Sequence, residues 1–482
     1  MTLKATLELA ETRLLWPQTT RGVVTLENVG EDPVERVNAE LDQARTALSV
    51  TALETGEVRL FARPPPPGGP FYSVSIAPGE RLEDRLLLSS RARLPGPGIY
   101  SVRAHAAWEG GAVDSVPVRV EVVRAAPRAV RLVTTSGGPA GHVYCAWVNA
   151  EGDSGALWLS LLTTNADADF AVSTRLARAP LTASPVLSAP PLGPSAHRFV
   201  AWTARCSLVC AVHASEQQVT TCMVELEATD YLIAAPLLEA PFAPGAAPHA
   251  EALLIHEIPG GYELRVAQLG ATATLGPAVS CEGPVPRWAH IAYRADGSRC
   301  TTFLAPRWLR PGEPAIAVSL GPWEPDAPPV QPVLQGNWPG VLLAADQTMT
   351  AEGTALGVAL LDMGIDAPRY ALQRWRVTTE GRFEEGTLTW VAWEHANPIA
   401  HAVLRVNVQH DPCALLLSGG PDAGWFRCDA RGEVVSLAGV IDPMAAPVDV
   451  FFVNWTEPAI LYNDPRCGLR IHTGRGERGP GA

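Results

Sequence analysis

Lysine is almost absent from this 482-residue chain, in which Lys4 stands alone among 37 basic residues. This shortage excludes mechanisms that need a lysine in the body of the chain, such as Schiff-base formation, a phosphate-loop lysine or a Ser-Lys dyad. Acidic residues outnumber basic ones, and the formal net charge is −13. Because phosphate binding relies on clustered lysine and arginine, this balance argues against a nucleic-acid partner.

Long apolar runs are also missing. No stretch approaches the 18 apolar residues of a membrane span, and the N-terminus lacks the apolar core of a signal peptide. The nine cysteines are odd in number and scattered, and the first of them is Cys145. Such usage is typical of free thiols in a reducing compartment. We therefore expect a cytoplasmic protein with no membrane contact and no disulfide framework.

Residues 1–124 are predicted to form an all-β domain. Leu3 to Leu9 alternates between apolar and polar residues, Gly22 to Leu26 is β-branched, and Val113 to Val123 alternates strictly. The segments TRGVVTLENVGEDPVERVNAEL and GIYSVRAHAAWEGGAVDSVPVRVEV resemble immunoglobulin-like modules of bacterial adhesion and scaffold proteins. This resemblance implies a β-sandwich, here without the disulfide of antibody domains.

A short pattern occurs seven times beyond residue 128. Each copy is an apolar run that closes on a large or polar residue, and successive copies lie 37 to 62 residues apart. A period near 50 with several short strands resembles β-propeller repeats in general, without matching a named subclass. The closing residues are Trp147, Trp202, His256, Tyr293, Asp346, Trp393 and Trp455.

The resemblance implies an N-terminal immunoglobulin-like sandwich (1–124), a linker (125–128), a seven-bladed propeller (129–473) and a disordered tail (474–482). Six or eight blades remain alternatives, because the step from His256 to Tyr293 is short and one strand there should be missing or very short. We expect Ala129 to Thr134 to pair with the last blade and close the ring.

No catalytic constellation is evident. Gly152-Asp153-Ser154-Gly155 resembles the sequence around the serine of chymotrypsin-like proteases, but it falls at a predicted hairpin tip, where these are ordinary turn residues. The eleven histidines form no H-x-x-x-H or H-E-x-x-H pattern. Asp346 interrupts an apolar run, and we expect it to hydrogen bond to a neighbouring blade. The sequence predicts no catalytic residue, metal ligand or cofactor, hence a non-enzyme.

A cluster of tryptophans supplies the candidate binding residues. Four of them fall within 51 residues, and the contexts of Trp308, Trp323 and Trp338 look like loops. Loop tryptophans beside arginine and proline are used by protein interfaces and by sugar platforms, although packing between blades explains them equally well. The candidates are Trp288, Arg307, Trp308, Trp323 and Trp338.

The first hypothesis for function is a non-catalytic scaffold or adaptor in a bacterial multiprotein assembly, such as one for defence or stress signalling. Its partner would be a protein of unknown identity, and its oligomeric state is open. The alternative is a glycan-binding or glycan-active protein with its site at the central channel. Convergent Asp, Glu and Arg there would favour the alternative, and an apolar channel the scaffold. A cleavable regulator or protease substrate is the third hypothesis.

Overall fold

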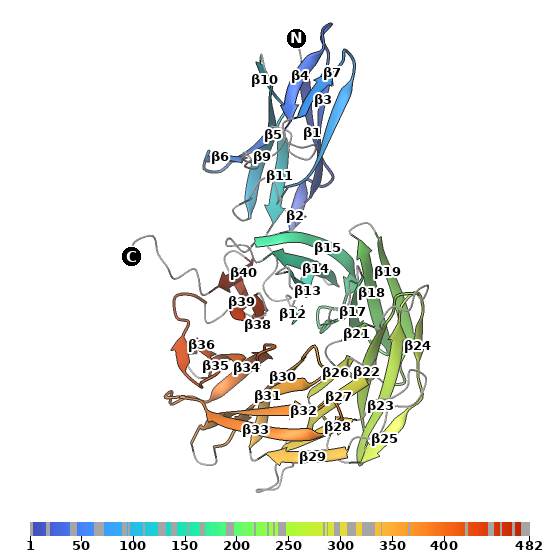
Figure 1. Ribbon diagram of the computed structural model, residues 1–482, viewed down its shortest axis with the longest axis vertical. Helices are drawn as coiled ribbons and strands as arrows, with labels where there is room; N and C mark the ends of the chain where they lie inside the picture. Colours follow the sequence, from blue (N-terminus) through green and yellow to red (C-terminus); the bar gives the residue numbers. More distant parts are fainter. Residues whose placement is uncertain are drawn as a thin grey trace. The chain divides into compact units, whose positions relative to one another are not determined.

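The structure is a computed structural model of the whole chain. It describes residues 3–473 except 16–19, 39–45, 62–71, 89–93, 95–96, 109–110, 124–131, 136–141, 152–153, 164–168, 189–196, 216–217, 229–230, 235–236, 240–246, 283–284, 287, 294–298, 306–314, 321–332, 339, 365–366, 420–422, 442–447, 454–455 and 465–467. All its regular elements in this part of the chain are β-strands (Figure 1). The predicted all-β class is therefore confirmed. No helix among these residues is long and apolar enough to cross a membrane.

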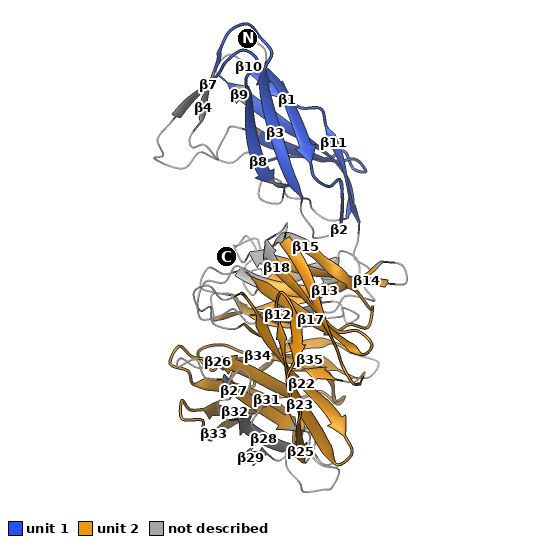
Figure 2. Ribbon diagram, turned by 90° about the vertical axis from the view of Figure 1, so that its right-hand side faces the viewer, with its two compact units in different colours: residues 1–125, 169–173, 466–469 blue, residues 126–168, 174–465, 470–482 orange. Residues whose placement is uncertain are grey.

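The chain divides into two compact units (Figure 2). The first comprises residues 1–125 with 169–173 and 466–469, and the second comprises 126–168, 174–465 and 470–482. The strands of residues 1–125 are β1 (Leu3–Leu9), β2 (Arg13–Leu15), β3 (Arg21–Asn28), β4 (Val34–Asn38), β5 (Thr46–Ala52), β6 (Val58–Phe61), β7 (Tyr72–Ile76), β8 (Arg81–Leu87), β9 (Gly98–Trp108), β10 (Gly111–Asp114) and β11 (Val118–Val123).

The first unit contains a sheet of order β1-β3-β8, a sheet of order β2-β11-β9-β5-β6 in which β10 also pairs with β9, and the pair β4-β7. One core joins the two larger sheets, because Val24 and Leu26 of β3 share a cluster with Leu48 of β5 and Val102 of β9. The alternation of β3 places every second residue in this core. The immunoglobulin-like assignment itself stays a prediction.

Two details of the first unit differ from the sequence prediction. The predicted strand Val113–Val123 is broken into β10 and β11, because Pro117 lies between them and proline cannot donate to a strand ladder. β2 and β7 were not predicted, since three and five residues give too short a periodic signal. The proline-rich segment 63–71 lies outside the described residues.

Seven successive antiparallel sheets make up the rest of the described chain, and each is open. The first two have the orders β12-β13-β14-β15 and β16-β17-β18-β19, and the last three β30-β31-β32-β33, β34-β35-β36-β37 and β38-β39-β40. Between them lie the six-stranded sheet of β20 to β25 and the sheet β26-β27-β28-β29.

The strands of the first three sheets are β12 (Leu132–Thr135), β13 (His142–Glu151), β14 (Ser154–Thr163), β15 (Asp169–Ala179), β16 (Val186–Leu187), β17 (Arg198–Thr203), β18 (Ser207–Ser215), β19 (Gln218–Glu225), β20 (Leu232–Ile233), β21 (Leu238–Glu239), β22 (Ala250–Ile258), β23 (Gly261–Leu269), β24 (Ala273–Leu275) and β25 (Val279–Glu282). Those of the last four are β26 (Trp288–Tyr293), β27 (Arg299–Ala305), β28 (Ala315–Leu320), β29 (Val333–Trp338), β30 (Val341–Met349), β31 (Ala355–Asp362), β32 (Tyr370–Val377), β33 (Phe383–Trp390), β34 (Ile399–Val406), β35 (Pro412–Ser418), β36 (Trp425–Cys428), β37 (Val434–Ser436), β38 (Val448–Val453), β39 (Glu457–Asp464) and β40 (Gly468–Thr473).

The first strands of these sheets contact one another in order. β26 contacts β30, β30 contacts β34, β34 contacts β38, and β38 contacts β12, which in turn contacts β16. A parallel bridge between Ser188, after β16, and Leu237, before β21, continues the series, and β21 contacts β26. Each first strand therefore has the first strands of two other sheets as its neighbours.

The short step from His256 to Tyr293 follows from the strands on which the two residues lie. His256 lies on β22, with which the two-residue strands β20 and β21 pair, whereas Tyr293 lies on β26, the first strand of the next sheet. Within this step, β24 of three residues pairs with one end of β23 and β25 pairs with the other. The expectation of a very short strand in this step is thus confirmed. The hairpin Ile258 to Gly261 turns at Gly260, whose φ of 86° lies in the left-handed region that favours glycine.

The repeat differs from the sequence prediction in its closure, and its closing residues take different positions. The predicted first strand (129–134) does not join the last sheet, because β12 pairs with β13 of its own sheet. The closing residues do not form one column: Trp147 and Trp202 lie on second strands, whereas Tyr293 and Asp346 lie on first strands. Trp393 follows β33 and lies outside any strand. Trp455 is outside the described residues.

Candidate functional site

The predicted binding residues lie in different environments or outside the described residues. Trp338 is fully buried within β29, so its predicted loop position is wrong, and its ring packs against Trp375 at 5.3 Å between centroids. Trp288 lies on β26, is partly buried and stacks on His290 at 5.9 Å. The remaining candidates, Arg307, Trp308 and Trp323, lie outside the described residues. A binding role for this set stays a prediction.

The protease-like motif falls at a hairpin. Glu151, the last residue of β13, pairs with Ser154, the first of β14, so the intervening residues connect two antiparallel strands. This agrees with the prediction of a hairpin at this motif, although Ser154 and Gly155 are themselves the first residues of β14.

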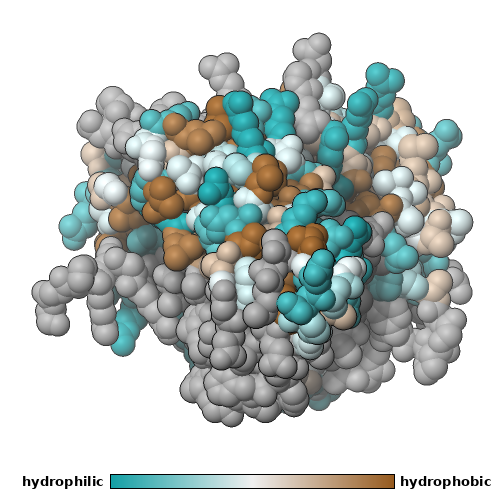
Figure 3. All heavy atoms as spheres, turned by 90° about the horizontal axis from the view of Figure 1, so that it is seen from above, coloured by the Kyte–Doolittle hydropathy of each residue, from teal (hydrophilic) through white to brown (hydrophobic). Residues whose placement is uncertain are grey.

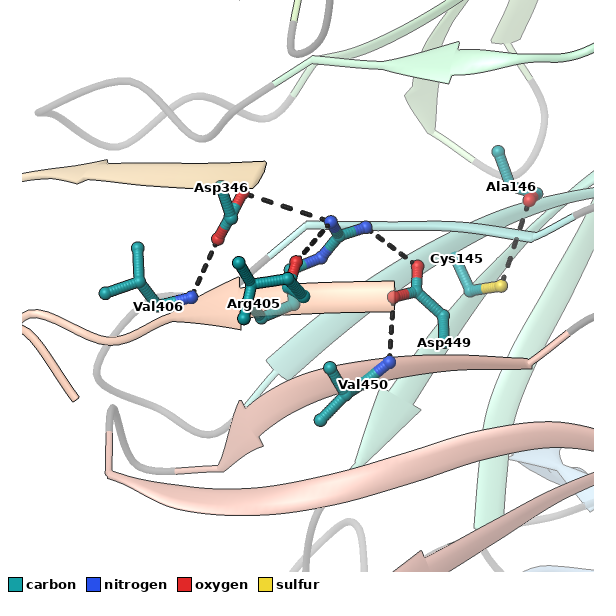
Figure 4. Close-up of polar contacts among 8 residues, drawn as sticks. Cys145, Ala146, Asp346, Arg405, Val406, Asp449 and Val450 are labelled. Atoms are coloured by element: carbon teal, nitrogen blue, oxygen red, sulfur yellow. Dashed lines mark hydrogen bonds and ion pairs between the residues drawn. The ribbon is translucent and has the colours of Figure 1, made fainter. Parts of the chain in front are cut away.

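A charged cluster forms instead where three first strands meet. Asp346 lies on β30, Arg405 on β34 and Asp449 on β38, so three consecutive sheets contribute one residue each. Arg405 Nη2 donates to Asp449 Oδ2 at 2.9 Å, and Arg405 Nη1 lies 3.9 Å from Asp346 Oδ1. Figure 4 shows the guanidinium between the two carboxylates. We call these residues the Asp-Arg-Asp cluster.

Backbone groups hold the two carboxylates of the cluster. The N–H of Val406 donates to Asp346 Oδ2 at 2.8 Å, which confirms the expected hydrogen bond from Asp346 to a neighbouring sheet. The N–H of Val450 donates to Asp449 Oδ1 at 2.7 Å, and Arg405 Nη1 also donates to the carbonyl of Leu404 at 3.1 Å. These contacts fix the direction of each polar side chain.

Burial differs within the cluster and sets its electrostatics. The side chains of Asp449, Asp346 and Arg405 are 5%, 17% and 28% exposed. Burial raises the pKa of Asp346 to about 6, against the opposing effects of Arg405 and backbone hydrogen bonds. For Arg405, burial lowers the pKa, but the charges of Asp449 and Asp346 outweigh it and the net shift is upward. The guanidinium is thus charged, and the Arg405 side chain is partly exposed.

A neutral imidazole lies on the next first strand. His290 of β26 is buried, and burial together with the charge of Arg405 lowers its pKa to about 3. Its Nδ1 lies 3.3 Å from Nε2 of Gln347, the residue after Asp346. Oε1 of Gln347, whose side chain is buried, has no hydrogen-bond partner in the described part of the chain. Four consecutive first strands therefore carry polar side chains.

A second polar group lies on the sheets of β16 and β21. Ser188 Oγ donates to Glu239 Oε1 at 2.5 Å, and Arg198 Nη1 lies 3.7 Å from the same oxygen. The guanidinium of Arg198 also stacks over the ring of Tyr144 at 4.3 Å. With the Asp-Arg-Asp cluster, this gives two groups in which an arginine contacts a carboxylate on a first strand.

Sequence analysis singled out Asp346 but missed Arg405 and Asp449. Both sit in strongly apolar strands, IAHAVLRV and VDVFFV, where a single charged residue interrupts the pattern. That interruption was the available signal. Charged residues are rarely buried unless they are paired, so each of these residues is expected to have a partner elsewhere in the chain.

No family model matches this chain, and no curated protein matches it. Solved structures similar to it include an ulvan lyase of a polysaccharide lyase family bound to a disaccharide repeat (9% identity, 72% of this chain and 93% of that chain, TM-score 0.44). A lectin of Aleuria aurantia in complex with α-methyl-L-fucoside has 10% identity, covers 80% and 95%, and has a TM-score of 0.28. A family 32 glycoside hydrolase of Bifidobacterium adolescentis has 10% identity, covers 94% and 95%, and has a TM-score of 0.28.

The expectation of a non-enzyme is contradicted by these comparisons, because polysaccharide lyase and glycoside hydrolase structures stand among them, and it is withdrawn. With TM-scores below 0.5, none of the three assigns a fold or an activity to this chain. What the chain binds has to be inferred from its own residues.

Proposed function

We propose that the second unit is a seven-bladed β-propeller and that the chain is a glycan-active protein whose site is the Asp-Arg-Asp cluster. The succession of seven sheets and the series of contacts between their first strands support the propeller. In this arrangement the first strands line the centre, where the sequence analysis sought convergent acidic residues and arginine.

The observation that carries the proposal is the convergence of Asp346 and Asp449 on Arg405, from strands far apart in sequence. Burying charged groups is unfavourable, and an apolar set of the same size would often stabilise a protein as well or better. A cluster of this kind therefore suits a site for a ligand better than the predicted scaffold, whose centre was expected to be apolar. On the face seen in Figure 3, hydrophobic and hydrophilic residues of the described part of the chain are interspersed.

The two carboxylates suit different steps of glycosidic bond cleavage. That chemistry needs one carboxyl group that keeps its proton to near neutral pH and another that stays ionised. Asp346, with a pKa of about 6, is the proposed proton donor to the leaving glycosidic oxygen. Asp449, which accepts a hydrogen bond from Arg405 at 2.9 Å, is the proposed second carboxyl group. Arg405, being partly exposed, would donate hydrogen bonds to sugar oxygens.

A polysaccharide panel tests this proposal. The purified chain is incubated with neutral and acidic polysaccharides while new reducing ends and unsaturated products are measured, which separates hydrolysis from elimination. Wild type should cleave at least one polysaccharide, and Asp346→Asn should lower kcat by about 100-fold or more. Asp449→Asn should do the same.

Asp114→Asn in the first unit serves as the matched control, since Asp114 also pairs with an arginine but is about half exposed. It should keep full activity. Folded wild-type protein that neither cleaves nor binds any polysaccharide of the panel would overturn the proposal, as would full activity in both cluster variants.

A further inference from the structure

Two cysteines face each other on neighbouring strands of the second sheet. Cys210 lies on β18 and Cys222 on β19, and the antiparallel register of this hairpin pairs them directly. Cys206 is closer to Cys210 along the chain, but the register pairs Cys210 with the cysteine across the hairpin.

The geometry fits a covalent bond between the two sulfurs. Directly opposed residues of an antiparallel pair have Cα atoms about 4.5 or 5.5 Å apart, and disulfides span Cα separations of about 4.4 to 6.8 Å. Both side chains belong to one core cluster, together with Phe199 and Leu269, so they lie on the same face of the sheet.

The surroundings make one thiol the more reactive. Cys222 is 8% exposed and lies on β19, an edge strand of its sheet. Cys210 is fully buried on β18, between β17 and β19. The neighbouring thiol of Cys210 lowers the pKa of Cys222 to about 7 against the effect of burial, with further help from the backbone at Gly270. Conversely, the contact with Cys222 and burial raise the pKa of Cys210. Near neutral pH, a substantial fraction of Cys222 is thus thiolate, while Cys210 keeps its proton.

We propose that Cys210 and Cys222 form a redox-active dithiol, oxidised to a cross-strand disulfide by a low-molecular-weight disulfide. The Cys222 thiolate attacks one sulfur of the small disulfide, forming a mixed disulfide and releasing one small thiolate. Cys210 then loses its proton, which the released thiolate takes up, and attacks Cys222 Sγ. The second small thiolate leaves and takes from solvent the proton that Cys222 had released. Two protein thiols are oxidised, and one small disulfide is reduced to two thiols.

Peptide mapping of the Cys206→Ser variant tests the proposal. The folded variant is incubated with oxidised glutathione, denatured, alkylated and cleaved after glutamate and arginine. Cleavage after Arg205, Glu216 and Glu225 places Cys210 and Cys222 on separate peptides, residues 206–216 and 217–225. With position 206 a serine, each peptide then holds one cysteine.

Oxidation should join these two peptides and remove both from the alkylated pool, and a thiol reductant should restore them. Adding Cys210→Ser should instead leave glutathione attached to peptide 217–225, because the resolving thiol is gone. Peptides that remain separate and fully alkylated after oxidation of the folded protein would overturn the proposal. A cross-link that forms only when the protein is oxidised under denaturing conditions would do so too.

Discussion

Asp114 in the first unit and Asp346 in the second are both carboxylates beside an arginine, yet their pKa values shift in opposite directions. Asp114 on β10 lies 2.7 Å from Nδ1 of His105 and 3.5 Å from Nη1 of Arg103, and it is 49% exposed. The hydrogen bond with His105 is the main cause of its lowered pKa. Asp346 is 17% exposed, and burial raises its pKa to about 6 despite Arg405.

This difference shows that proximity of opposite charge does not decide the role of a carboxylate. In the first unit, solvent screens a surface network that contributes little to stability. In the second unit, removal from water dominates, and the cluster holds a proton at a pH where an ordinary aspartate has lost it. Only the buried arrangement provides a proton donor near neutral pH, which is why the proposed site lies there.

Removing Arg405 should show the largest difference in stability between the buried and the exposed arginine–carboxylate pairs. Arg405→Ala leaves Asp449 buried without its counter-charge, so we expect a loss of about 4 kcal/mol in the free energy of unfolding of the second unit. Arg103→Ala, the matched change beside Asp114, should lose less than about 1 kcal/mol. Hydrogen exchange followed by mass spectrometry, on peptides covering β34 and β9, measures both losses separately. Equal losses in the two variants would contradict the distinction between buried and exposed pairs.

The contributions of Asp346 and Asp114 to stability should depend on pH in opposite directions. Between pH 3.8 and about 6, the unfolded chain releases the Asp346 proton before the folded one does. The contribution of Asp346 to the free energy of unfolding therefore falls as pH rises through this window, by about 3 kcal/mol in total. Asp346→Asn should abolish this fall, as measured by urea unfolding from pH 3.5 to 7.

Asp114 should behave oppositely, because its folded pKa is lowered. Its contribution is present above its ordinary value of 3.8 and is lost as pH falls through the folded value. Asp114→Asn should consequently flatten the acid limb of the first unit alone. If Asp346→Asn left the pH dependence of the free energy of unfolding of the second unit unchanged, Asp346 would not be protonated in this range.

Much of the strand content could be predicted from the sequence, for a physical reason that also limits the prediction. Alternation identifies a strand when one face is buried, as in β1, whose bounds match the predicted Leu3 to Leu9. It cannot tell which strand of a sheet a segment becomes. Trp147 and Asp346 each close an apolar run of the same kind, yet Trp147 lies on a second strand and Asp346 on a first strand. The place of a strand in its sheet is set by pairing with distant segments.

The candidate site shows the same limit. Asp346 could be selected because a carboxylate in an apolar run needs a partner, and the predicted contact to the next sheet is present. Arg405 is 59 residues away along the chain, and nothing local links the two. Trp338 shows the converse: its neighbours Gly336 and Pro339 suggest a loop, but tertiary packing against Trp375 buries it in a strand.

Asn28 sharpens the comparison, because the first unit does bury a polar side chain, but an uncharged one. Asn28 is fully buried at the end of β3, and its Nδ2 donates to the carbonyls of Asp32 and Ile76 at 2.8 Å each. Its Oδ1 accepts from the N–H of Gly30 at 2.9 Å. Asn28→Ala should lower the free energy of unfolding of the first unit by about 2 kcal/mol, because three backbone groups lose a partner. Since an amide does not titrate, the loss should be the same at pH 4 and pH 7, as hydrogen exchange on peptides of β3 can measure. A loss that changed between these two pH values would mean that charge, not hydrogen bonding, sets the stability of this turn, and the contrast with Asp346 would fail.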